Sequence, residues 1–554
     1  MNTQEYIGEL ERRSLKGDSN SSLVDYISGL NLTVAMENEL LDFVEHHKNG
    51  KNLPDIIVSD RQLRDSVQEA TQALFQANNP PALFVRNGEL VEIKTDETGK
   101  PYIKPVGKAA LKNKLARSAN FFRIRTRITI SVTPPDDIAE AIMAQNNNAF
   151  PGLADIIECP VLRSDGSIIC QPGYDPTTRL FYQPVKDFVM PEIPNNPTLT
   201  QIVEATNLIH EIIKDFPFDT EASRANCFAA MFTPILRPMI DGVTPLHLFD
   251  KPAPGSGATK LAEVISLIAT GHSAAMMAAQ KDDEGWRKAI FSLLLRGQSI
   301  VTIDNIENTL WTPSLASILT ANTFQDRILG KSEMMTFPNR CTWIATGNNI
   351  RIAGDLPRRC VLIKIDAKVP QPWRRDPAIF THPNLLEWVG HERGNILAAM
   401  LTIATAWVRS GKPECPNLRQ LGGFEAYTKV VGGVLSTMMV TDFLGNLDQM
   451  YDEMDSDTPV WDGFLQCWHE NIGEEPITVH SLIEWLKSDS QLAETLPDTL
   501  AFDEGKGYSR RLGNAISKRK DVVFPSGLLI KKGGEFRKAI CWKCVSFAGQ
   551  TLNI

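Results

Sequence analysis

The stretch from Leu246 to Ile265 constrains the fold of this chain more than any other. It starts with an apolar run that predicts a buried strand, continues through prolines and glycines, and ends in a helical pattern. A strand, a glycine-rich loop and a helix N-terminus in this order form a cradle in which backbone N–H groups bind phosphate. The residues expected to build the cradle are Pro254, Gly255, Ser256, Gly257, Ala258, Thr259 and Lys260.

One position of this loop departs from the phosphate-binding pattern. The pattern requires Gly-Lys-Ser/Thr, and here Gly257 is followed by Ala258 and Thr259. Because Thr259 occupies the Ser/Thr position, Ala258 stands where the lysine belongs, and Lys260 comes two positions too late to replace it. Without the cation that binds the β- and γ-phosphates, nucleotide binding should weaken and hydrolysis should fall steeply.

Length and composition limit the class of protein. A chain of 554 residues predicts two to four domains. The net charge of −9 gives no global support for nucleic-acid binding, so such a site must come from local basic patches. No apolar run is long enough to cross a membrane, and the nine cysteines are scattered as in a reducing compartment. We therefore expect a cytoplasmic protein with no membrane partner.

The pattern changes along the chain predict an α/β protein of several parts. Three prolines between Pro191 and Pro197 resist both helix formation and strand pairing, which marks a linker there. The predicted parts are an N-terminal helical segment (1–55), an N-terminal α/β domain (56–190), the linker (191–197), a nucleotide-binding core (198–385), a helical segment (386–455) and a basic C-terminal domain (460–554).

The N-terminal α/β domain has two local signals. Asn87-Gly88 between apolar runs predicts a β-hairpin. The segment from Lys104 to Arg127 is basic and contains Phe121-Phe122, a combination that suits a surface tracking a nucleic-acid strand. A solvated helix face explains the same charges, and both interpretations stay open.

The C-terminal domain combines helices with a basic hairpin. Helices at Ile477–Lys487 and Tyr508–Lys518, then strands turning at Gly533-Gly534, give the order of a winged helix. Charge reversal in an acidic protein favours nucleic-acid contact here. The candidate DNA-binding residues are Arg510, Arg511, Lys518 and Arg519.

Three further elements follow the glycine loop in an order that strengthens its interpretation. A buried strand ends at Asp304-Asn305, where an ATPase needs a carboxylate that organises Mg²⁺. A second buried strand ends near Asn348, whose amide can orient an attacking water. Arg358 and Arg359 come next, and a guanidinium is suited to the charge of a transferring phosphoryl group.

Together these elements resemble the AAA+ ATPases, and more narrowly the superfamily 3 replicative DNA helicases of phages, plasmids and integrated mobile elements. The narrower resemblance rests on Asp326–Pro338, which looks like the hairpin that such helicases insert into their central channel. The likeness covers about 198 to 455 well, and the flanking parts fit the family's architecture less specifically.

The resemblance implies a fold, cofactors and roles. ATP would lie in the glycine loop, with Mg²⁺ bound by Thr259 and Asp304 and water positioned by Asn348. Arg358 or Arg359 would act on a neighbouring subunit, which implies a homo-oligomer, as a hexamer, with single-stranded DNA in its channel and duplex at the fork. A separate primase or polymerase would be a partner. The resemblance places Arg327 and Lys331 on or beside the channel hairpin, and Lys331 is the better candidate for the DNA phosphates.

Two departures from the family pattern remain. Asn305 replaces the usual second acid, so either it only orients water or Glu307 assists. Ala258 is explained by a Lys-to-Ala change introduced to stop turnover, which we favour because the other site residues remain, or by natural loss of activity. The overall prediction is an ATP-driven DNA helicase with impaired hydrolysis. The alternative is a nucleotide-gated DNA-binding assembly module, such as an initiator, loader or defence scaffold, without processive unwinding.

Overall fold

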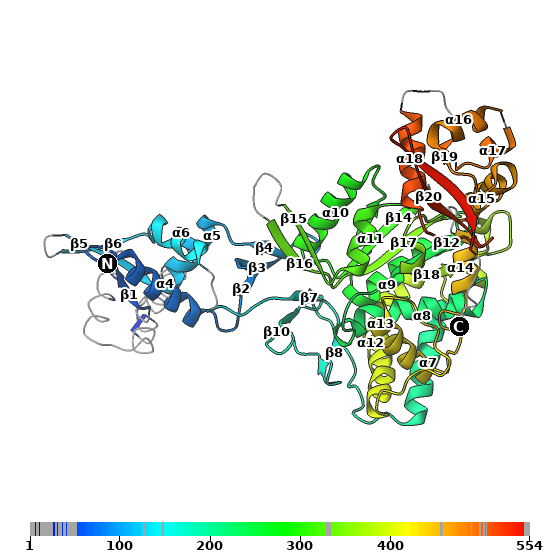
Figure 1. Cartoon of the computed structure of the whole chain (residues 1–554). Helices are drawn as coiled ribbons and strands as arrows, with labels where there is room; N and C mark the ends of the chain where they lie inside the picture. The colour runs from blue at the N-terminus through cyan, green and yellow to red at the C-terminus, as the bar shows by residue number, and fades with distance from the viewer. Residues whose placement is uncertain are drawn as a thin grey trace.

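The computed structural model describes residues 53–547 except 126–127, 146–148, 308, 328–333, 455–457, 489, 498–499, 502–504 and 506, together with a few residues between 6 and 40 (Figure 1). The predicted helical segment 1–55 and Lys331 therefore lie outside the described residues, apart from those few. Among the helices that the structure describes, none combines the length and apolarity needed to cross a membrane.

The N-terminal unit is an α/β assembly with a hydrophobic core of its own. That core includes Ile56, Leu74, Leu115 and Ile142, all nearly inaccessible to solvent. The sheet order β1-β5-β6 places β5 between a parallel and an antiparallel neighbour. The elements are β1 (Asp55–Ile57), α4 (Leu63–Ala77), α5 (Lys108–Ser118), β5 (Asn120–Arg125), β6 (Ile128–Val132) and α6 (Asp136–Ala144).

A second sheet, β2-β3-β4, connects this unit to the rest of the molecule. The predicted hairpin is confirmed, because Asn87 and Gly88 both have positive φ between the antiparallel strands β2 and β3. Arg86 is buried, and its Nη1 donates to the carbonyls of Leu294 and Leu295, each at 3.1 Å. The strands are β2 (Leu83–Arg86), β3 (Glu89–Thr95) and β4 (Pro101–Pro105).

Short strands between 155 and 182 pack into the large central core. Val161, Leu180 and Tyr182 are buried members of that core. The segment 191–197 has no helix or strand, as its prolines predict, and Arg409 Nε donates to the Asn195 carbonyl at 2.9 Å. The strands are β7 (Asp155–Ile157), β8 (Val161–Leu162), β9 (Ile168–Ile169), β10 (Gly173–Asp175) and β11 (Leu180–Tyr182).

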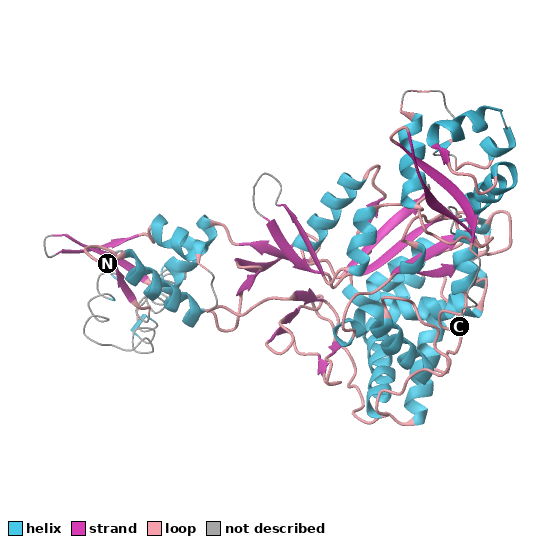
Figure 2. Cartoon of the chain, in the orientation of Figure 1, coloured by secondary structure: helices cyan, strands magenta, loops and turns pink. Residues whose placement is uncertain are grey.

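The centre of the molecule is a five-stranded parallel sheet in the order β13-β14-β17-β12-β18 (Figure 2). The strand before the glycine loop, β12, therefore lies between β17 and β18, with β14 beyond β17. A parallel, mostly buried sheet of this kind is consistent with a P-loop core. The strands are β12 (Leu246–Lys251), β13 (Met276–Ala278), β14 (Ile300–Ile306), β17 (Thr342–Asn348) and β18 (Cys360–Lys364).

Helices enclose this sheet. α9 contacts β12, β14 and β17, α8 contacts β18, and the long α12 packs on α7 and α9. An antiparallel hairpin, β15–β16, lies between α11 and β17 in the sequence. The elements are α7 (Leu199–Ile213), α8 (Glu221–Leu236), α9 (Ala258–Thr270), α10 (Asp283–Leu295), α11 (Pro313–Thr320), β15 (Thr323–Arg327), β16 (Met334–Pro338), α12 (Leu385–Arg409), α13 (Glu425–Thr437) and α14 (Leu447–Met454).

The C-terminal part has a separate core and a three-stranded sheet, β19-β21-β20. The predicted turn at Gly533-Gly534 is wrong, because the strands reverse at Arg537-Lys538, which both have positive φ. Gly534 instead lies beside a register shift within β20, where a bulge uses its backbone freedom. The elements are α15 (Thr458–Ile472), β19 (Ile477–Thr478), α16 (Val479–Ser488), α17 (Ser490–Glu494), α18 (Tyr508–Lys518), β20 (Leu528–Phe536) and β21 (Ala539–Ser546).

Candidate nucleotide-binding site

The glycine loop occupies the predicted place between β12 and α9, and two of its glycines are required by geometry. Gly255 and Gly257 have φ of 78° and 113°, a region that L side chains rarely adopt. A Cβ on Gly255 would lie 2.8 Å from Trp373 Cβ, and one on Gly257 would lie 2.8 Å from the Phe216 ring. The loop can therefore keep this shape only with glycine at both positions.

Asp304 meets the start of α9 at the carboxyl edge of the sheet. Thr259 Oγ1 donates to Asp304 Oδ1 at 3.2 Å, and Thr346 Oγ1 donates to the same oxygen at 2.5 Å. A register shift between Ile303 and Ile306, with Asn305 at φ 56°, turns the strand end here. The structure thus brings together the hydroxyl and carboxylate that the sequence assigns to Mg²⁺.

Asn348 ends β17 directly beside the last residue of the glycine-loop strand, Lys251. Its Oδ1 is buried and has no hydrogen-bond partner among the described residues. Buried acceptors are nearly always satisfied, so this oxygen has capacity for a bound water or ligand. The next residue, Asn349, reaches the loop itself, because its Nδ2 donates to the Pro252 carbonyl at 3.5 Å.

The position that lacks lysine is fully buried. Ala258 is the first residue of α9 and its side chain is 0% exposed, whereas Lys260 is exposed. Lys251 is half-buried at the end of β12; burial lowers the pKa of its ammonium, and the Asp304 and Asp250 carboxylates oppose that shift. Lys251 therefore lies close enough to the Asp304 carboxylate for the two charges to interact.

A segment after β18 covers the glycine loop, and no sequence motif predicts this contact. Arg375 Nη2 donates to the Ser256 carbonyl at 3.4 Å, and its guanidinium lies 5.2 Å from the centroid of the Phe380 ring. Trp373 is 56% exposed beside Gly255. The segment follows no motif spacing, so only the tertiary contacts reveal it.

The donor set fits Mg²⁺ and a nucleoside triphosphate, except for the missing lysine. Hydroxyl and carboxylate oxygens are hard ligands that Mg²⁺ prefers, and it commonly uses one or two of them together with substrate phosphates. No cluster of three His, Cys, Asp or Glu ligands occurs among the residues that the structure describes. A metal at Thr259 and Asp304 would thus depend on phosphate oxygens for much of its coordination.

Asn305 and Glu307 lie together beside Asp304. Asn305 Nδ2 donates to Glu307 Oε1 at 2.8 Å, and both residues are exposed at the strand end. Glu307 is therefore the first carboxylate that follows Asp304 in the sequence. It is the residue that the sequence suggests as a possible assistant to Asn305.

The two predicted arginines lie at the amino ends of the parallel strands, whereas the glycine loop follows the carboxyl end of β12. Both precede Cys360, which pairs with Leu246, the first residue of β12. Arg359 is tied within its own chain, since its Nη1 donates to the Ala316 carbonyl and its Nη2 to Asp355 Oδ2 at 2.9 Å. Among the residues that the structure describes, Arg358 forms an ion pair only with Asp355, and it keeps 64% of its side chain exposed.

A β-hairpin, β15–β16, lies where the sequence resemblance predicts the channel hairpin, and Arg327 ends its first strand. β15 and β16 pair from Thr323↔Pro338 to Arg327↔Met334, and Arg327 is exposed. Arg287 on α10 holds the hairpin through an ion pair of 3.4 Å with Asp326.

The four C-terminal candidates divide into two kinds. Arg510, Arg511 and Lys518 are exposed on α18, opposite its buried Leu512 face. The Arg519 guanidinium instead lies 4.1 Å from the Trp461 ring centroid and is half-buried. Its stacking indicates a packing role within the domain.

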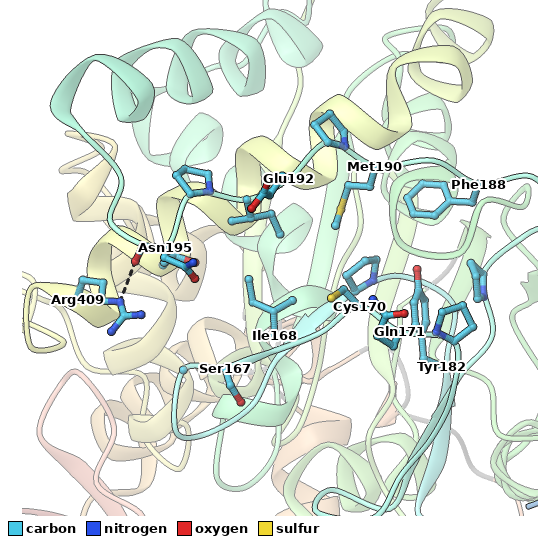
Figure 3. A pocket seen from close by; sticks show the side chains of 18 residues that line it. Ser167, Ile168, Cys170, Gln171, Tyr182, Phe188, Met190, Glu192, Asn195 and Arg409 are labelled. Carbon is cyan, nitrogen blue, oxygen red and sulfur yellow. Dashed lines mark hydrogen bonds between the residues drawn. The ribbon is translucent and has the colours of Figure 1, made fainter. Parts of the chain in front are cut away.

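A cavity of about 590 Å³ lies apart from this site, between the short strands and α12 (Figure 3). Cys170, Tyr182 and Met190 line it, and Arg409 bonds Asn195 at its rim. It contains none of the residues predicted to bind nucleotide, metal or DNA.

The chain matches no protein-family model and no curated protein. Among solved structures it is similar to the apo C-terminal region of NrS-1, at 14% identity and TM-score 0.31, over 82% of this chain and 96% of that one. It is also similar to the active Cch helicase of SCCmec type IV, at 10% identity and TM-score 0.30, over 83% of this chain and 91% of that one. It is similar to JCV helicase bound to a small molecule at 13% identity and TM-score 0.22, over 46% of this chain and 67% of that one. Such low scores establish neither a family nor an activity, so the functional conclusion rests on the geometry of the site.

Proposed function

We propose that this chain is a subunit of a ring-forming, ATP-driven DNA helicase of a phage or mobile element, impaired in hydrolysis by Ala258. The observation that carries the proposal is the division of the site between two edges of one sheet. Thr259, Asp304 and Asn348 gather at the edge with the glycine loop. Arg358 is exposed at the other edge.

At the glycine-loop edge, backbone N–H groups and the N-terminus of α9 bind the phosphates. Thr259 and Asp304 hold Mg²⁺, which supplies neutralisation of the charge that develops on the phosphates. The buried Asn348 Oδ1 accepts a hydrogen bond from the attacking water and orients it. Asn305 cannot accept a proton as a base, so its hydrogen-bonded neighbour Glu307 is the candidate carboxylate for that role.

Arg358 acts in trans because its own glycine loop is out of reach. The loop follows Lys251 at the carboxyl end of β12. Arg358 precedes Cys360, which pairs with Leu246 at the amino end of β12, five residues before Lys251. At about 3.3 Å per residue this is about 17 Å of strand alone. A neighbour in a closed ring, as in a hexamer, brings the two edges together.

DNA contact is assigned to two surfaces. The β15–β16 hairpin carries Arg327, and Lys331 between its strands would contact the phosphates of a single strand in the ring's channel. The C-terminal domain, with α18 followed by the β20–β21 hairpin, has the order of a winged helix, and Arg510, Arg511 and Lys518 would contact duplex at the fork. A separate primase or polymerase would use the exposed strand.

The test restores the missing cation. Ala258→Lys should raise DNA-stimulated ATP hydrolysis about a hundredfold or more, the effect typical of one preorganised charged contact to the transition state. The same variant should displace a strand from forked DNA, with the family resemblance implying 3′-to-5′ movement. Hydrolysis without unwinding on forks of either polarity would contradict the helicase claim. A folded variant that binds DNA yet hydrolyses no ATP would contradict the nucleotide site.

A second function, a nucleotide-gated assembly module, is favoured by Ala258 itself, since binding without turnover suffices for assembly. Lys331→Ala separates the two. If Lys331→Ala, made in the Ala258→Lys protein, abolishes unwinding while rings still form, the hairpin moves DNA. If unwinding never occurs and ATP only changes the size of the assembly, the module interpretation stands.

A further inference from the structure

The N-terminal unit carries a two-stranded arm that the nucleotide site does not explain. β1 pairs with β5 only as far as Phe122, so Arg123–Arg125 and Ile128–Ile130 pair with each other alone. The arm lies at the end of this unit that faces away from the central sheet (Figure 1). It is joined to the rest through the base of β5, where Phe121 is buried.

One face of the arm combines cations with exposed apolar side chains. Arg123 lies opposite Ile130 and Arg125 opposite Ile128, and residues two apart on a strand share a face. Ile128 is 65% exposed and Ile130 is 45% exposed, and both arginines are exposed. An exposed apolar patch bordered by charge is characteristic of a contact surface.

The cations of the arm differ from those of the neighbouring helix. The sequence from 98 to 135 contains nine Lys or Arg and no Asp or Glu. On α5, Lys108 is paired with Asp136 and Glu140, and Lys112 with Asp136. Among the residues that the structure describes, no ion pair is recorded for Arg123 or Arg125. Their charge is therefore directed to something outside the unit.

We propose that the arm binds duplex DNA, with Arg123 and Arg125 on phosphates and Ile128 and Ile130 against the groove. A two-stranded β-ribbon has the width to enter the major groove, and arginine is a frequent phosphate ligand there. A single strand would instead need exposed aromatic rings on which its bases stack. Phe121 is 2% exposed in the core, and the half-buried Phe122 lies on the strand face opposite to Arg123 and Arg125, so the predicted basic and aromatic side chains do not form one platform here.

A second copy of the chain fits the arm less well than a polyanion. The outer edge of β6 is open, because β6 is the last strand of its sheet. Pairing two such edges would join β6 to β6 and leave the arginines of both copies, one strand further in on β5, without an opposite charge. DNA phosphates neutralise these charges and release counterions instead.

The test measures the salt dependence of binding with the full chain, a labelled 30-base-pair duplex and one of its single strands. R123Q/R125Q should reduce the slope of log K against log salt for the duplex by about 1.8, since each phosphate contact contributes about 0.9. I128S/I130S should weaken duplex binding while leaving the slope within about 0.3 of the parent value, because it removes no charge. R123K/R125K should largely retain the parent slope.

The matched control is K108Q/K112Q, which removes the same charge from the same unit but from residues already paired with acids. It should leave the slope within about 0.5 of the parent value. An equal slope change in the control, an unchanged slope in R123Q/R125Q, or an equal loss of single-strand binding would each overturn the proposal. Thermal unfolding of each variant, matching the parent, confirms that the fold is intact.

This proposal goes beyond the helicase function and stands or falls separately. The measurement uses no nucleotide, so duplex binding through the arm should be the same in the parent and in Ala258→Lys. Failure of Ala258→Lys to hydrolyse ATP would contradict the proposed function and leave the arm result intact.

Discussion

At the scale of single residues, two neighbouring arginines with the same charge have different surroundings. Arg359 keeps 11% of its side chain exposed and bonds to α11 and Asp355, whereas Arg358 keeps 64% exposed. Sequence alone cannot separate them, because both follow the same strand. The difference in burial assigns packing to Arg359 and leaves Arg358 for a neighbouring subunit.

The two arginines should therefore respond differently to truncation. In the lysine-restored chain, Arg358→Ala should lower kcat for ATP about a thousandfold, as loss of an arginine finger does, with stability unchanged within about 0.5 kcal/mol. Arg359→Ala should lower the free energy of unfolding by about 1–3 kcal/mol, because it leaves buried acceptors unpaired. Steady-state ATPase and denaturant unfolding separate the two effects. An unstable Arg358→Ala or a stable but inactive Arg359→Ala would reverse the assignment.

Glu158 gives a second prediction at this scale. Burial raises the pKa of its carboxyl to about 7, with Lys100 and Arg393 opposing the shift, and its Oε2 lies 3.5 Å from His272 Nε2. A carboxyl whose pKa is raised in the folded state contributes its full stability to the fold at pH values below the pKa of the unfolded state. That stability is lost as pH rises from about 4.5 to about 7.

Glu158→Gln should remove this loss. The free energy of unfolding of the variant, relative to that of the parent, should therefore rise by about 3 kcal/mol when the pH is raised from about 4.5 to about 7.5. Unfolding measured at both pH values checks it. His272→Gln is the control, because burial lowers the pKa of His272 and its contribution falls as pH decreases instead. A constant difference between Glu158→Gln and the parent at both pH values would contradict the burial effect.

At the scale of elements, the glycine loop is shaped by a segment more than a hundred residues away. Gly255 packs on the backbone of Trp373, and Arg375 donates to the loop carbonyl of Ser256. The short segment after β18 thus excludes a side chain at Gly255. This dependence links the end of the sheet to the phosphate cradle.

Gly255→Ala should displace this segment, whereas Gly99→Ala should only strain a turn. Both glycines have similar φ, 78° and 83°, but a Cβ on Gly99 meets no atom within 4 Å. Each change should cost about 1–2 kcal/mol for the left-handed conformation. In the lysine-restored chain, only Gly255→Ala should also weaken binding of a fluorescent ATP analogue, by about tenfold or more. Equal ATP affinities of the two variants would show that the segment does not shape the loop.

At the scale of the whole molecule, the proposed function requires that a second copy completes the site, because Arg358 and the glycine loop lie at opposite ends of the sheet's strands. The parent chain has Arg358 but lacks the lysine, whereas Ala258→Lys/Arg358→Ala has the lysine but lacks the arginine. In a ring that mixes both, the parent would supply Arg358 to the lysine-bearing site of its neighbour. The parent is thus a natural partner for complementation.

Mixing these two inactive proteins should restore ATP hydrolysis, with a maximum at an intermediate ratio. The arginine finger contributes about a thousandfold or more to kcat, so even a few complete sites exceed the background. Mixing the parent with Ala258→Lys/Asp304→Ala is the control and should restore nothing, because no site then contains both the lysine and Asp304. Absence of rescue in the first mixture, under conditions where both proteins co-assemble, would contradict action in trans.

Most of the local structure follows from the sequence. The strand, glycine loop and helix from Leu246 to Thr270 form as the apolar run and glycines predict, and Asn87-Gly88 turns its hairpin. These signals succeed because φ preferences, chain stiffness and the spacing of apolar residues depend on residues close in sequence. The turn at Gly533-Gly534 fails for the complementary reason, since a bulge and a turn use the same backbone freedom and only strand register separates them.

The sequence by itself determined the candidate chemistry: a phosphate cradle without its lysine, an acid at Asp304, an amide at Asn348 and a pair of arginines. Only the tertiary structure decided which of these groups meet. The parallel order β14-β17-β12 brings Thr259 to Asp304, and the pairing of Cys360 with Leu246 puts Arg358 at the far edge. The physical reason is that strand order and register are set by burial of whole strand faces against their neighbours, a property of the assembled sheet.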